Sequence, residues 1–366
     1  MRWEVPRLSL NQTPGLLAIS DLTINYRSGK GRVHAVQNVS LDIGANQFVA
    51  VVGESGCGKS TLALAIIGLL SIPPAVIEAG KIEYKSVNLL SLKESERRKY
   101  RGTEIAMIFQ EPLTSLNPVY KVGDQIAEAI MIREQRDASG ESLETGIMQK
   151  AYNSKSVPIP SKLHLPRPVS RDRKPAILDA LKRVRIADPD HVIDRYPFEL
   201  SGGMRQRVMI AMALAQKPAL LLADEPTTAL DVTTQAQVLK LMKTLMSEVN
   251  TSILLITHDL AVACQVADRI LVMYAGDLVE DSDVYELFSD PLHPYTKGLL
   301  TCIPSGSKND TELKPIPGSV YDLTKQTEGC KFASRCSYSM EICRKKKPVL
   351  VETKRGHRVA CFLYGE

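Results

Sequence analysis

Apolar and polar positions alternate in places along the first part of the chain, for example at residues 17–20 and 39–43. A strand with one buried face has this period of two, because successive side chains point to opposite faces of a sheet. Residues 17–45 are therefore predicted to form antiparallel strands.

Short, nearly continuous apolar runs replace the alternation further along the chain. Strands that are buried on both faces of a parallel sheet have this pattern. The runs lie at residues 47–52, 105–109, 220–223, 253–256 and 270–273, and helical stretches at 60–70, 204–215 and 233–249 separate them. Strands that alternate with helices predict an α/β core with a mostly parallel sheet.

Two segments interrupt this organisation. Residues 134–176 are polar and rich in Ser, Gly and Pro, which predicts a linker or insertion without chemistry of its own. Prolines at positions 291 and 294 close the α/β region, and a cysteine-rich segment follows residue 317. The predicted divisions are an N-terminal tail (1–16), an α/β domain (17–290) and a C-terminal extension (291–366).

The composition is that of an ordinary globular protein. Of 366 residues, 44% are apolar and 24% are charged, which excludes a chain that is disordered throughout. The net charge of +5 is too small to indicate nucleic-acid binding by itself, and it is concentrated in residues 327–366. No apolar run approaches the ~20 residues of a membrane-spanning helix. Residues 1–16 also lack the apolar stretch of a signal peptide, so we expect a soluble, cytoplasmic protein.

Residues 53–60 fit the pattern G-x-x-x-x-G-K-[ST] between a predicted strand and a predicted helix. Glycines in such a loop bring backbone N–H groups against phosphate oxygens, and the following helix directs its positive N-terminus at the same anion. Lys59 is predicted to neutralise the β and γ phosphates of a nucleotide, Ser60 to bind Mg²⁺, and Cys57 only to fill the loop. The predicted nucleotide-binding residues are Gly53, Glu54, Ser55, Gly56, Cys57, Gly58, Lys59, Ser60 and Thr61.

A second element of this chemistry is an apolar strand that ends in two acids, Asp224 and Glu225. Asp224, at the carboxyl end of the strand, is predicted to hold Mg²⁺ through water. Glu225 is predicted to orient or polarise the attacking water, because phosphoryl transfer depends mostly on positioning and charge stabilisation.

Residues 200–207 (Leu-Ser-Gly-Gly-Met-Arg-Gln-Arg) resemble the signature of ATP-binding-cassette (ABC) ATPases, which other phosphate-loop enzymes lack. Gln110 resembles the Q-loop glutamine of that family, Asp231 lies in a segment similar to its D-loop, and His258 resembles its switch histidine. The resemblance implies a RecA-like parallel-sheet core, an antiparallel β subdomain and a helical signature subdomain, followed here by a small cysteine-rich extension.

The resemblance implies two shared nucleotide sites. In this family the signature binds the ATP held by the opposite subunit, so one chain supplies one half of each of two sites. The residues implied for this role, together with the D-loop aspartate, are Ser201, Gly202, Gly203 and Asp231.

The resemblance also implies residues around the reacting phosphate. Its catalytic group would be Glu225, His258 and Gln110. Its Mg²⁺ ligands would be Ser60, Gln110 and Asp224. Tyr26 would stack on adenine, with a tyrosine of an alternating strand as the other interpretation.

Four further segments are similar to the oligopeptide/dipeptide/nickel importer branch of the family: residues 110–118, 224–233, 293–296 and 316–318. The implied function is ATP hydrolysis that powers an importer of peptides, or of nickel or oligosaccharides. The implied partners are two membrane-spanning permease subunits, a second, related ATPase subunit in a heterodimer, and an extracytoplasmic solute-binding protein. The chain would then lie at the cytoplasmic face of the membrane.

An ABC ATPase that acts on nucleic acid or ribosomes is the alternative of a different class. Those machines usually carry two cassettes or long coiled-coil insertions, and this sequence has one cassette and no such insertion. We therefore expect no nucleic-acid partner. A regulatory ATPase with a redox-sensing metal cluster is a third hypothesis.

Four of the seven cysteines crowd into the C-terminal segment: Cys330, Cys336, Cys343 and Cys361. Their spacing matches neither a C-x₂-C zinc pair nor a ferredoxin run, but four thiolates can hold tetrahedral zinc or a cubane cluster. The importer branch carries a four-iron four-sulfur (4Fe-4S) cluster at this spacing, so the resemblance implies one here, with zinc, disulfides or free thiols as alternatives. A structural role is preferred over a redox role, because so short a segment buries little core.

Overall fold

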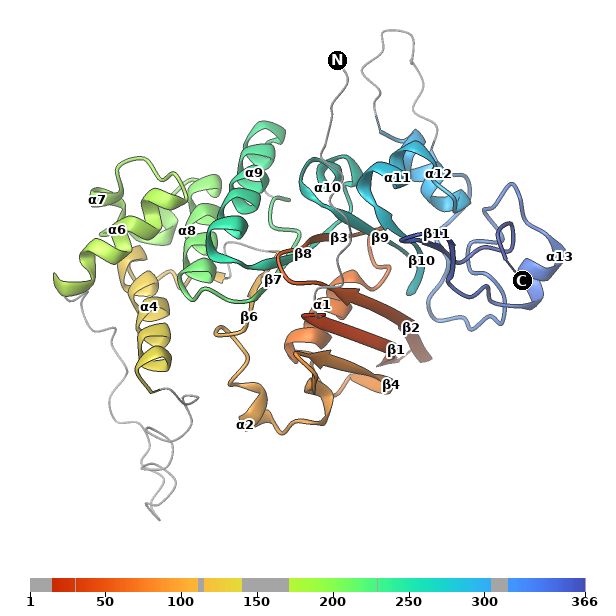
Figure 1. Cartoon of the computed structure of the whole chain (residues 1–366), viewed down its shortest axis with the longest axis horizontal. Helices are drawn as coiled ribbons and strands as arrows, with labels where there is room; N and C mark the ends of the chain where they lie inside the picture. The colour runs from red at the N-terminus through yellow and green to blue at the C-terminus, as the bar shows by residue number, and fades with distance from the viewer. Residues whose placement is uncertain are drawn as a thin grey trace, which may run out of the picture.

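The computed structural model describes residues 15–29, 31–110, 115–139, 171–228, 230–303 and 315–365. A group of helices lies at one end of the long axis, two sheets occupy the middle, and the C-terminal segment lies at the other end (Figure 1). The middle region lies between these two ends, and it contains the predicted phosphate loop at residues 53–60 and the two acids at 224–225.

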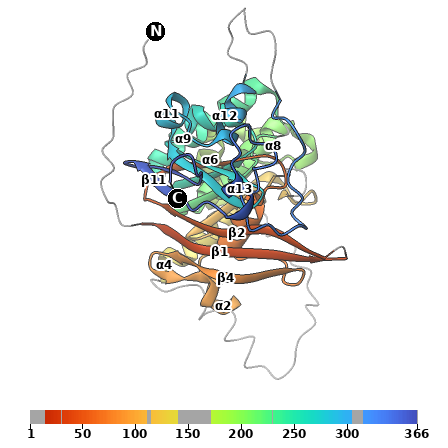
Figure 2. The ribbon, with the colours of Figure 1, turned by 90° about the vertical axis from the view of Figure 1, so that its right-hand side faces the viewer.

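An antiparallel sheet forms one layer of the middle region (Figure 2). It contains β1 (Leu17–Ser28), β2 (Gly31–Ile43), β4 (Ala75–Tyr84) and β5 (Val87–Asn88), in the order β2-β1-β4-β5. Leu17 pairs with Ile43 and with Tyr84, so β1 lies between β2 and β4. The antiparallel strands predicted for residues 17–45 are confirmed, whereas β4 lacks a regular alternation and was not anticipated.

A second, larger sheet has the order β11-β12-β10-β9-β3-β8-β7-β6. Its strands are β3 (Phe48–Val52), β6 (Ile105–Ile108), β7 (Leu220–Asp224), β8 (Ser252–Thr257), β9 (Arg269–Tyr274), β10 (Asp277–Asp283), β11 (Val351–Lys354) and β12 (His357–Val359). The five neighbours from β9 to β6 pair in parallel and are the five predicted apolar runs, which confirms them. β10 and the β11–β12 hairpin add an antiparallel edge.

The helix that follows β3, α1 (Lys59–Ile67), packs between the two sheets. Val49 and Val51 of β3 face α1 and the antiparallel sheet, and the other three residues of β3 belong to a second core that the helices cover. β3 is buried on both faces, as its apolar sequence requires.

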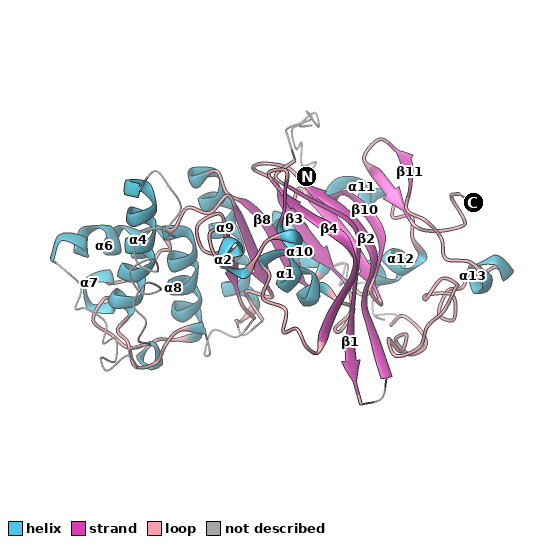
Figure 3. Ribbon diagram, turned by 90° about the horizontal axis from the view of Figure 1, so that it is seen from below, coloured by secondary structure: helices cyan, strands magenta, loops and turns pink. Residues whose placement is uncertain are grey.

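Helices gather at the end of the molecule away from the C-terminal segment (Figure 3). They are α4 (Val122–Ser139), α6 (Lys174–Arg183), α7 (Pro189–Val192) and α8 (Gly202–Ala215). Ile126, Leu181 and Val208 from three of these helices are fully buried in one core. The predicted helices at 60–70, 204–215 and 233–249 are confirmed as α1, α8 and α9 (Val232–Val249).

The described ends of the predicted insertion at 134–176 are helical, because α4 runs to Ser139 and α6 begins at Lys174. The core residues of α4 and α6, such as Ile126, Ile177 and Leu181, lie outside this segment, and its interpretation as an insertion stays a prediction. Residues 140–170, and residues 1–14 of the predicted N-terminal tail, lie outside the described residues.

Shorter elements connect these layers. They are the 3₁₀ turns η1 (Leu89–Ser91), η2 (Arg171–Arg173) and η3 (Pro197–Glu199), and the helices α2 (Glu94–Arg97), α10 (Leu260–Val266), α11 (Val284–Ser289), α12 (Pro294–Thr301) and α13 (Glu341–Lys345). None of the helices in the described ranges combines the length and the apolar character that crossing a membrane requires.

The C-terminal segment attaches to the large sheet through buried ionic contacts as well as through β12. The carboxylate of Glu280, which is fully buried, accepts hydrogen bonds from the backbone N–H groups of Leu292 and His293 and from Nε2 of His357, at 2.7, 2.9 and 2.8 Å. Asp277 pairs with Lys331 and Lys347, at 3.3 and 2.7 Å. The segment is thus part of the folded core.

We predict that His357→Ala lowers the free energy of unfolding by about 3 kcal/mol, because it removes one partner of a buried carboxylate. Urea titration followed by circular dichroism measures the change. The control is Lys345→Ala, which removes an exposed ion pair with Glu341 and should leave stability unchanged. Equal effects of the two substitutions would show that the Glu280–His357 contact does not stabilise the fold.

Candidate nucleotide-binding and catalytic site

The phosphate loop (residues 53–60) joins β3 to α1, and glycine is required at two of its positions. A Cβ atom on Gly53 would lie 2.1 Å from the carbonyl oxygen of Met273. Gly58 has a φ of +104°, and a Cβ atom there would lie 2.1 Å from the carbonyl oxygen of Ala35. The loop therefore lies directly against β2 and β9, with Ser55 and Gly56 exposed at its tip.

Lys59 points back into the phosphate loop. Its ammonium donates to the carbonyl oxygens of Gly53 and Glu54, at 2.8 and 3.0 Å, and only 5% of the residue is exposed. Cys57 is buried beside it, and burial raises the pKa of the Cys57 thiol. A protonated thiol is a poor nucleophile, which agrees with a packing role for Cys57.

Asp224 ends β7 and lies next to the start of α1. Its Oδ1 atom accepts a hydrogen bond from the hydroxyl of Ser60 at 3.1 Å. Burial raises the pKa of Asp224, although the Ser60 hydrogen bond opposes this shift. A carboxylate and a hydroxyl are oxygen donors of the kind that Mg²⁺ prefers, so this pair fits the predicted metal position.

Three side chains donate hydrogen bonds to the carboxylate of Glu225. Those of His258 and Gln110 were predicted to lie in the site, and that of Thr228 was not. Its Oε1 atom accepts from Nδ1 of His258 at 3.0 Å, and its Oε2 atom accepts from Nε2 of Gln110 at 3.1 Å and from the hydroxyl of Thr228 at 2.9 Å. Partial burial would raise the pKa of Glu225, but the hydrogen bonds from His258 and Thr228 lower it overall. The carboxylate is therefore ionised near neutral pH and can accept a proton or orient water.

The backbone of Glu225 is also unusual, with a φ of +44° in the left-handed region. The N–H group of Glu225 donates to the carbonyl oxygen of Ile256 in β8 at 2.9 Å. A non-glycine residue in this conformation costs free energy, and such residues cluster at functional sites. The hydrogen bond to β8 stabilises this turn, which follows directly after β7.

Sheet topology explains why these residues meet. β3, β8, β7 and β6 are parallel neighbours, so their carboxyl ends lie along one edge. The phosphate loop, His258, Asp224 and Gln110 each follow or end one of these strands. In open α/β sheets, ligands bind at this carboxyl edge.

The predicted signature residues lie elsewhere. Ser201 accepts from the N–H of Met204 at 3.3 Å and so caps the N-terminus of α8, in the helical group. Asp231 caps α9 by accepting from the N–H of Thr234 at 2.9 Å. A Cβ atom on Gly203 would lie 3.2 Å from Thr234, so the starts of α8 and α9 are packed together. Gly202 is the first residue of α8 and follows directly after the capping residue Ser201.

Tyr26 lies half-buried on β1, and its hydroxyl is 3.2 Å from the hydroxyl of Thr61 in the first turn of α1. The side chain is therefore next to the phosphate loop. Stacking of its ring on adenine stays a prediction.

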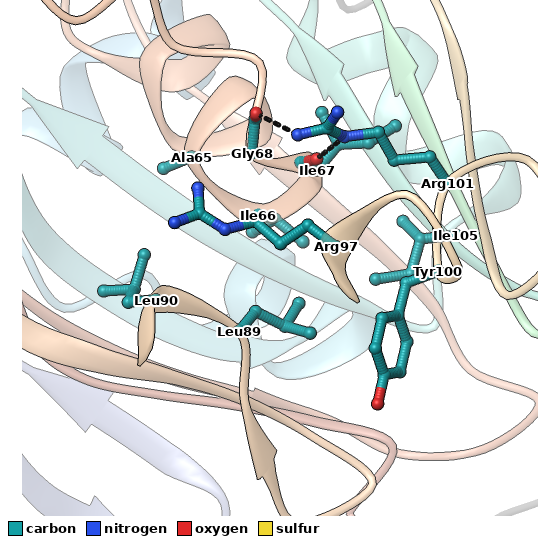
Figure 4. Close-up of a pocket in the computed structure, with 10 residues that line it drawn as sticks. All are labelled: Ala65, Ile66, Ile67, Gly68, Leu89, Leu90, Arg97, Tyr100, Arg101 and Ile105. Carbon is teal, nitrogen blue, oxygen red and sulfur yellow. Dashed lines mark hydrogen bonds between the residues drawn. The ribbon is translucent and has the colours of Figure 1, made fainter. Parts of the chain in front are cut away.

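Several contacts around the site carry no local sequence pattern. The guanidinium of Arg101 donates to the carbonyl oxygens of Ile67 and Gly68, at 2.8 and 2.5 Å, beside a hollow that Arg97 also lines (Figure 4). A cation at the C-terminus of a helix is favourable, so Arg101 fixes the far end of α1. Thr228 and the C-terminal contacts to Glu54, described below, are further examples.

The four C-terminal cysteines line one cavity, together with side chains that include His293, Phe332 and Met340. Within the described ranges, no three His, Cys, Asp or Glu side chains are placed as the ligands of a metal ion. Burial raises the pKa of Cys330 to about 12 and raises the pKa values of Cys336 and Cys361. The cavity thus gathers four thiols, and burial favours the protonated form of three of them, Cys330, Cys336 and Cys361.

Two protein-family models match the chain. The model described as ABC transporter matches residues 36–228, and the model described as Oligopeptide/dipeptide transporter, C-terminal region matches residues 279–343. The first match includes the phosphate loop and Glu225, and the second includes three of the four C-terminal cysteines.

Individual relatives match over nearly the whole chain. The oligopeptide transport ATP-binding protein OppD of Bacillus subtilis is 43% identical over 95% of this chain and 88% of its own length. The dipeptide transport ATP-binding protein DppD of Escherichia coli is 40% identical over 94% of this chain and 96% of its own length. A solved structure of the dimeric ATP-binding cassette MJ0796, bound to ADP and phosphate, is similar with a TM-score of 0.57 and 25% identity, over 73% of this chain and 98% of that chain.

We predict that Lys59→Ala weakens the binding of MgATP at least about tenfold, because it removes a charge-assisted hydrogen bond to phosphate. Equilibrium titration of the purified full-length chain with a fluorescent ATP analogue gives the dissociation constant. Lys243→Ala is the control, since Lys243 also donates to a backbone carbonyl oxygen, that of Val266, but outside the loop. Unchanged affinity in Lys59→Ala would remove the loop from the nucleotide site.

Proposed function

Because this chain belongs to the ATP-binding subunits of ABC transporters, in the oligopeptide/dipeptide family, we propose that it hydrolyses ATP to power the uptake of peptides. Its fold is that of an ABC-type phosphate-loop ATPase, as predicted, and members of this family hydrolyse ATP to drive transport. The observation that carries the proposal for the site is the carboxylate of Glu225, which three side chains orient beside the phosphate loop.

The proposed mechanism assigns each group of the site a physical task. Backbone N–H groups of the phosphate loop and the ammonium of Lys59 bind the β and γ phosphates. Glu225 orients the attacking water and accepts its proton, and its lowered pKa keeps the carboxylate ionised at neutral pH. His258 and Gln110 hold Glu225 in place through their hydrogen bonds.

Mg²⁺ would be held by Ser60 and Asp224, with Gln110 as a further ligand, and it would neutralise charge that develops on the phosphates. The 3.1 Å contact between the Ser60 hydroxyl and Asp224 supports this assignment, because both oxygens then lie within reach of one ion. Burial disfavours the ionised form of Asp224 and raises its pKa, and a bound cation would offset that cost by stabilising the carboxylate.

We assign Ser201, Gly202, Gly203 and Asp231 to the ATP of a second subunit. Ser201 and Asp231 are exposed. The N-terminus of α8, a helix of 14 residues, carries a partial positive charge next to Ser201 and can bind an anion. Ser201 precedes α8 and Asp231 precedes α9, and both helices lie apart from α1, the helix that follows the chain's own phosphate loop (Figure 1). A second, related ATPase subunit in a heterodimer would complete both sites, as in a family that works in pairs.

Membrane partners follow from the proposed transport. Two permease subunits would carry the spanning helices, and an extracytoplasmic solute-binding protein would deliver the peptide. Phe109 and Val119, which flank the segment after Gln110, are 41% and 69% exposed and offer an apolar contact for a permease. The chain would then be a peripheral protein at the cytoplasmic face of the membrane, with no nucleic-acid partner.

We also propose that Cys330, Cys336, Cys343 and Cys361 hold a 4Fe-4S cluster, in preference to zinc. The donor set fits, because four thiols from one short segment line a single cavity. A bound cluster would stabilise the thiolate forms of Cys330, Cys336 and Cys361, which burial alone disfavours, and would contribute folding free energy to the segment. Its proposed role is structural.

Glu225→Gln should reduce ATP turnover at least a hundredfold in the assembled transporter, because the amide cannot accept a proton. Affinity for MgATP should stay within about threefold, since the phosphate loop is untouched. Phosphate release by the complex and uptake of a radiolabelled dipeptide by cells measure the two activities. Glu341→Gln, at an exposed site in α13, is the control. A Glu225→Gln complex that retains most of its turnover would assign the catalytic carboxylate to another residue.

Cys336→Ser should lower the iron content of anaerobically purified protein to background and make residues 315–365 sensitive to protease. Cys302→Ser, outside the cavity, should leave both unchanged. Iron analysis and mass spectrometry of the digest provide the measurements. Equal iron and equal protection in the two variants would contradict the cluster.

A further inference from the structure

The C-terminal segment contacts the phosphate loop directly, through Arg335. Two nitrogens of its guanidinium donate to the two carboxylate oxygens of Glu54, at 2.9 and 3.1 Å. Only 4% of the Arg335 side chain is exposed. Paired hydrogen bonds of this kind are strong and fix the relative orientation of both groups. Glu54 is the second residue of the phosphate loop and lies 281 positions earlier in the chain.

Other contacts hold the guanidinium of Arg335 in one position. It donates to the carbonyl oxygens of Pro317 and Ile316, at 2.9 and 3.3 Å, and to the hydroxyl of Tyr274 at 3.3 Å. It also lies over the rings of Tyr274 and Phe332, 5.7 and 5.8 Å from their centres. Residues 316–318 were noted above only for their similarity to the importer branch. Two of them, Ile316 and Pro317, accept hydrogen bonds from Arg335 and so help to hold its guanidinium in place.

Glu54 is correspondingly held at three points. Its N–H donates to the hydroxyl of Tyr295 at 2.9 Å, its carbonyl oxygen accepts from Lys59 at 3.0 Å, and its carboxylate pairs with Arg335. Tyr295 and Arg335 both come from the part of the chain after residue 290. Tyr295 packs against Tyr274 and Phe332, with ring centres 4.7 and 5.4 Å apart, so one aromatic cluster supports both contacts.

We propose that Arg335 is a positioning residue for ATP binding: it neutralises the carboxylate of Glu54 and so keeps the phosphate loop suitable for a polyanion. An unpaired carboxylate in this loop would repel the phosphates over a distance of a few ångströms. Pairing with Arg335 cancels that repulsion and fixes the backbone of the loop before ATP arrives. The inference rests on the proposed function, because it assumes that the loop binds ATP.

Titration of the purified full-length chain with mant-ATP and Mg²⁺ tests this role. Arg335→Ala should raise the dissociation constant about tenfold, and Arg335→Lys should raise it less, because the charge remains while the paired geometry is lost. The double substitution Arg335→Ala with Glu54→Ala should restore affinity to within about threefold of the unmodified chain. That recovery separates charge neutralisation from a general loss of structure, which a second substitution would not repair.

Arg358→Ala is the matched control. Arg358 also pairs with a carboxylate of the α/β domain, Asp281, but it lies away from the loop, so its loss should leave mant-ATP affinity unchanged. Circular dichroism and thermal unfolding confirm that each variant is folded. If Arg335→Ala is not folded, Arg335→Lys and Arg358→Lys carry the comparison, with a higher dissociation constant expected only for Arg335→Lys.

Two results would overturn the inference: affinity in Arg335→Ala equal to that in Arg358→Ala, or a double variant as weak as Arg335→Ala alone. Equal affinity in Arg335→Lys and the unmodified chain would do the same if Arg335→Ala cannot be purified. An unmodified chain that does not bind mant-ATP would instead refute the proposed function.

Discussion

The parallel pairing of β3 with β8 on one side and β9 on the other is the constraint on which the site depends. Because β3 is central, the phosphate loop emerges between the ends of its neighbours, and a Cβ atom on Gly53 would collide with β9. β7 and β6 continue the parallel order and bring Asp224 and Gln110 to the same edge. The chemistry of the site is thus a consequence of strand order, and Glu225 is where the contributions of several strands meet.

The C-terminal segment also constrains the phosphate loop, through the contacts of Tyr295 and Arg335 with Glu54. β12 extends the large sheet, the buried pair of Glu280 and His357 fixes this edge, and Tyr295 reaches Glu54. The extension is therefore continuous with the ATPase core rather than a separate appendage. Arg335, which contacts the phosphate loop, is followed directly in sequence by Cys336, which lines the cysteine cavity. Adjacent residues thus link the cavity to the loop.

The sequence predicted the elements with local signals. Apolar runs predicted the five parallel strands. The motifs predicted roles for Lys59, Asp224, Glu225 and His258, which stay proposals, and the structure brings these residues to one edge of the large sheet. Contacts between distant segments had no such signal: β10 pairs with β12 across nearly eighty residues, and Arg335 meets Glu54 across 281. The helical ends of the segment at 134–176 were not predicted, because these ends are polar and the apolar residues of α4 and α6 that pack in the core lie outside it. Thr228 was missed because a threonine near a turn is unremarkable until its hydroxyl is seen to bind Glu225.

The central claim is that this chain is the ATPase of a membrane importer. The most direct test is a pull-down of the tagged full-length chain from detergent-solubilised native membranes, with a nuclease-treated soluble extract in parallel and mass spectrometry of both. The account predicts two multi-span permease subunits and a second, related cassette ATPase in the membrane sample. Recovery only with ribosomal or DNA-bound proteins would contradict it.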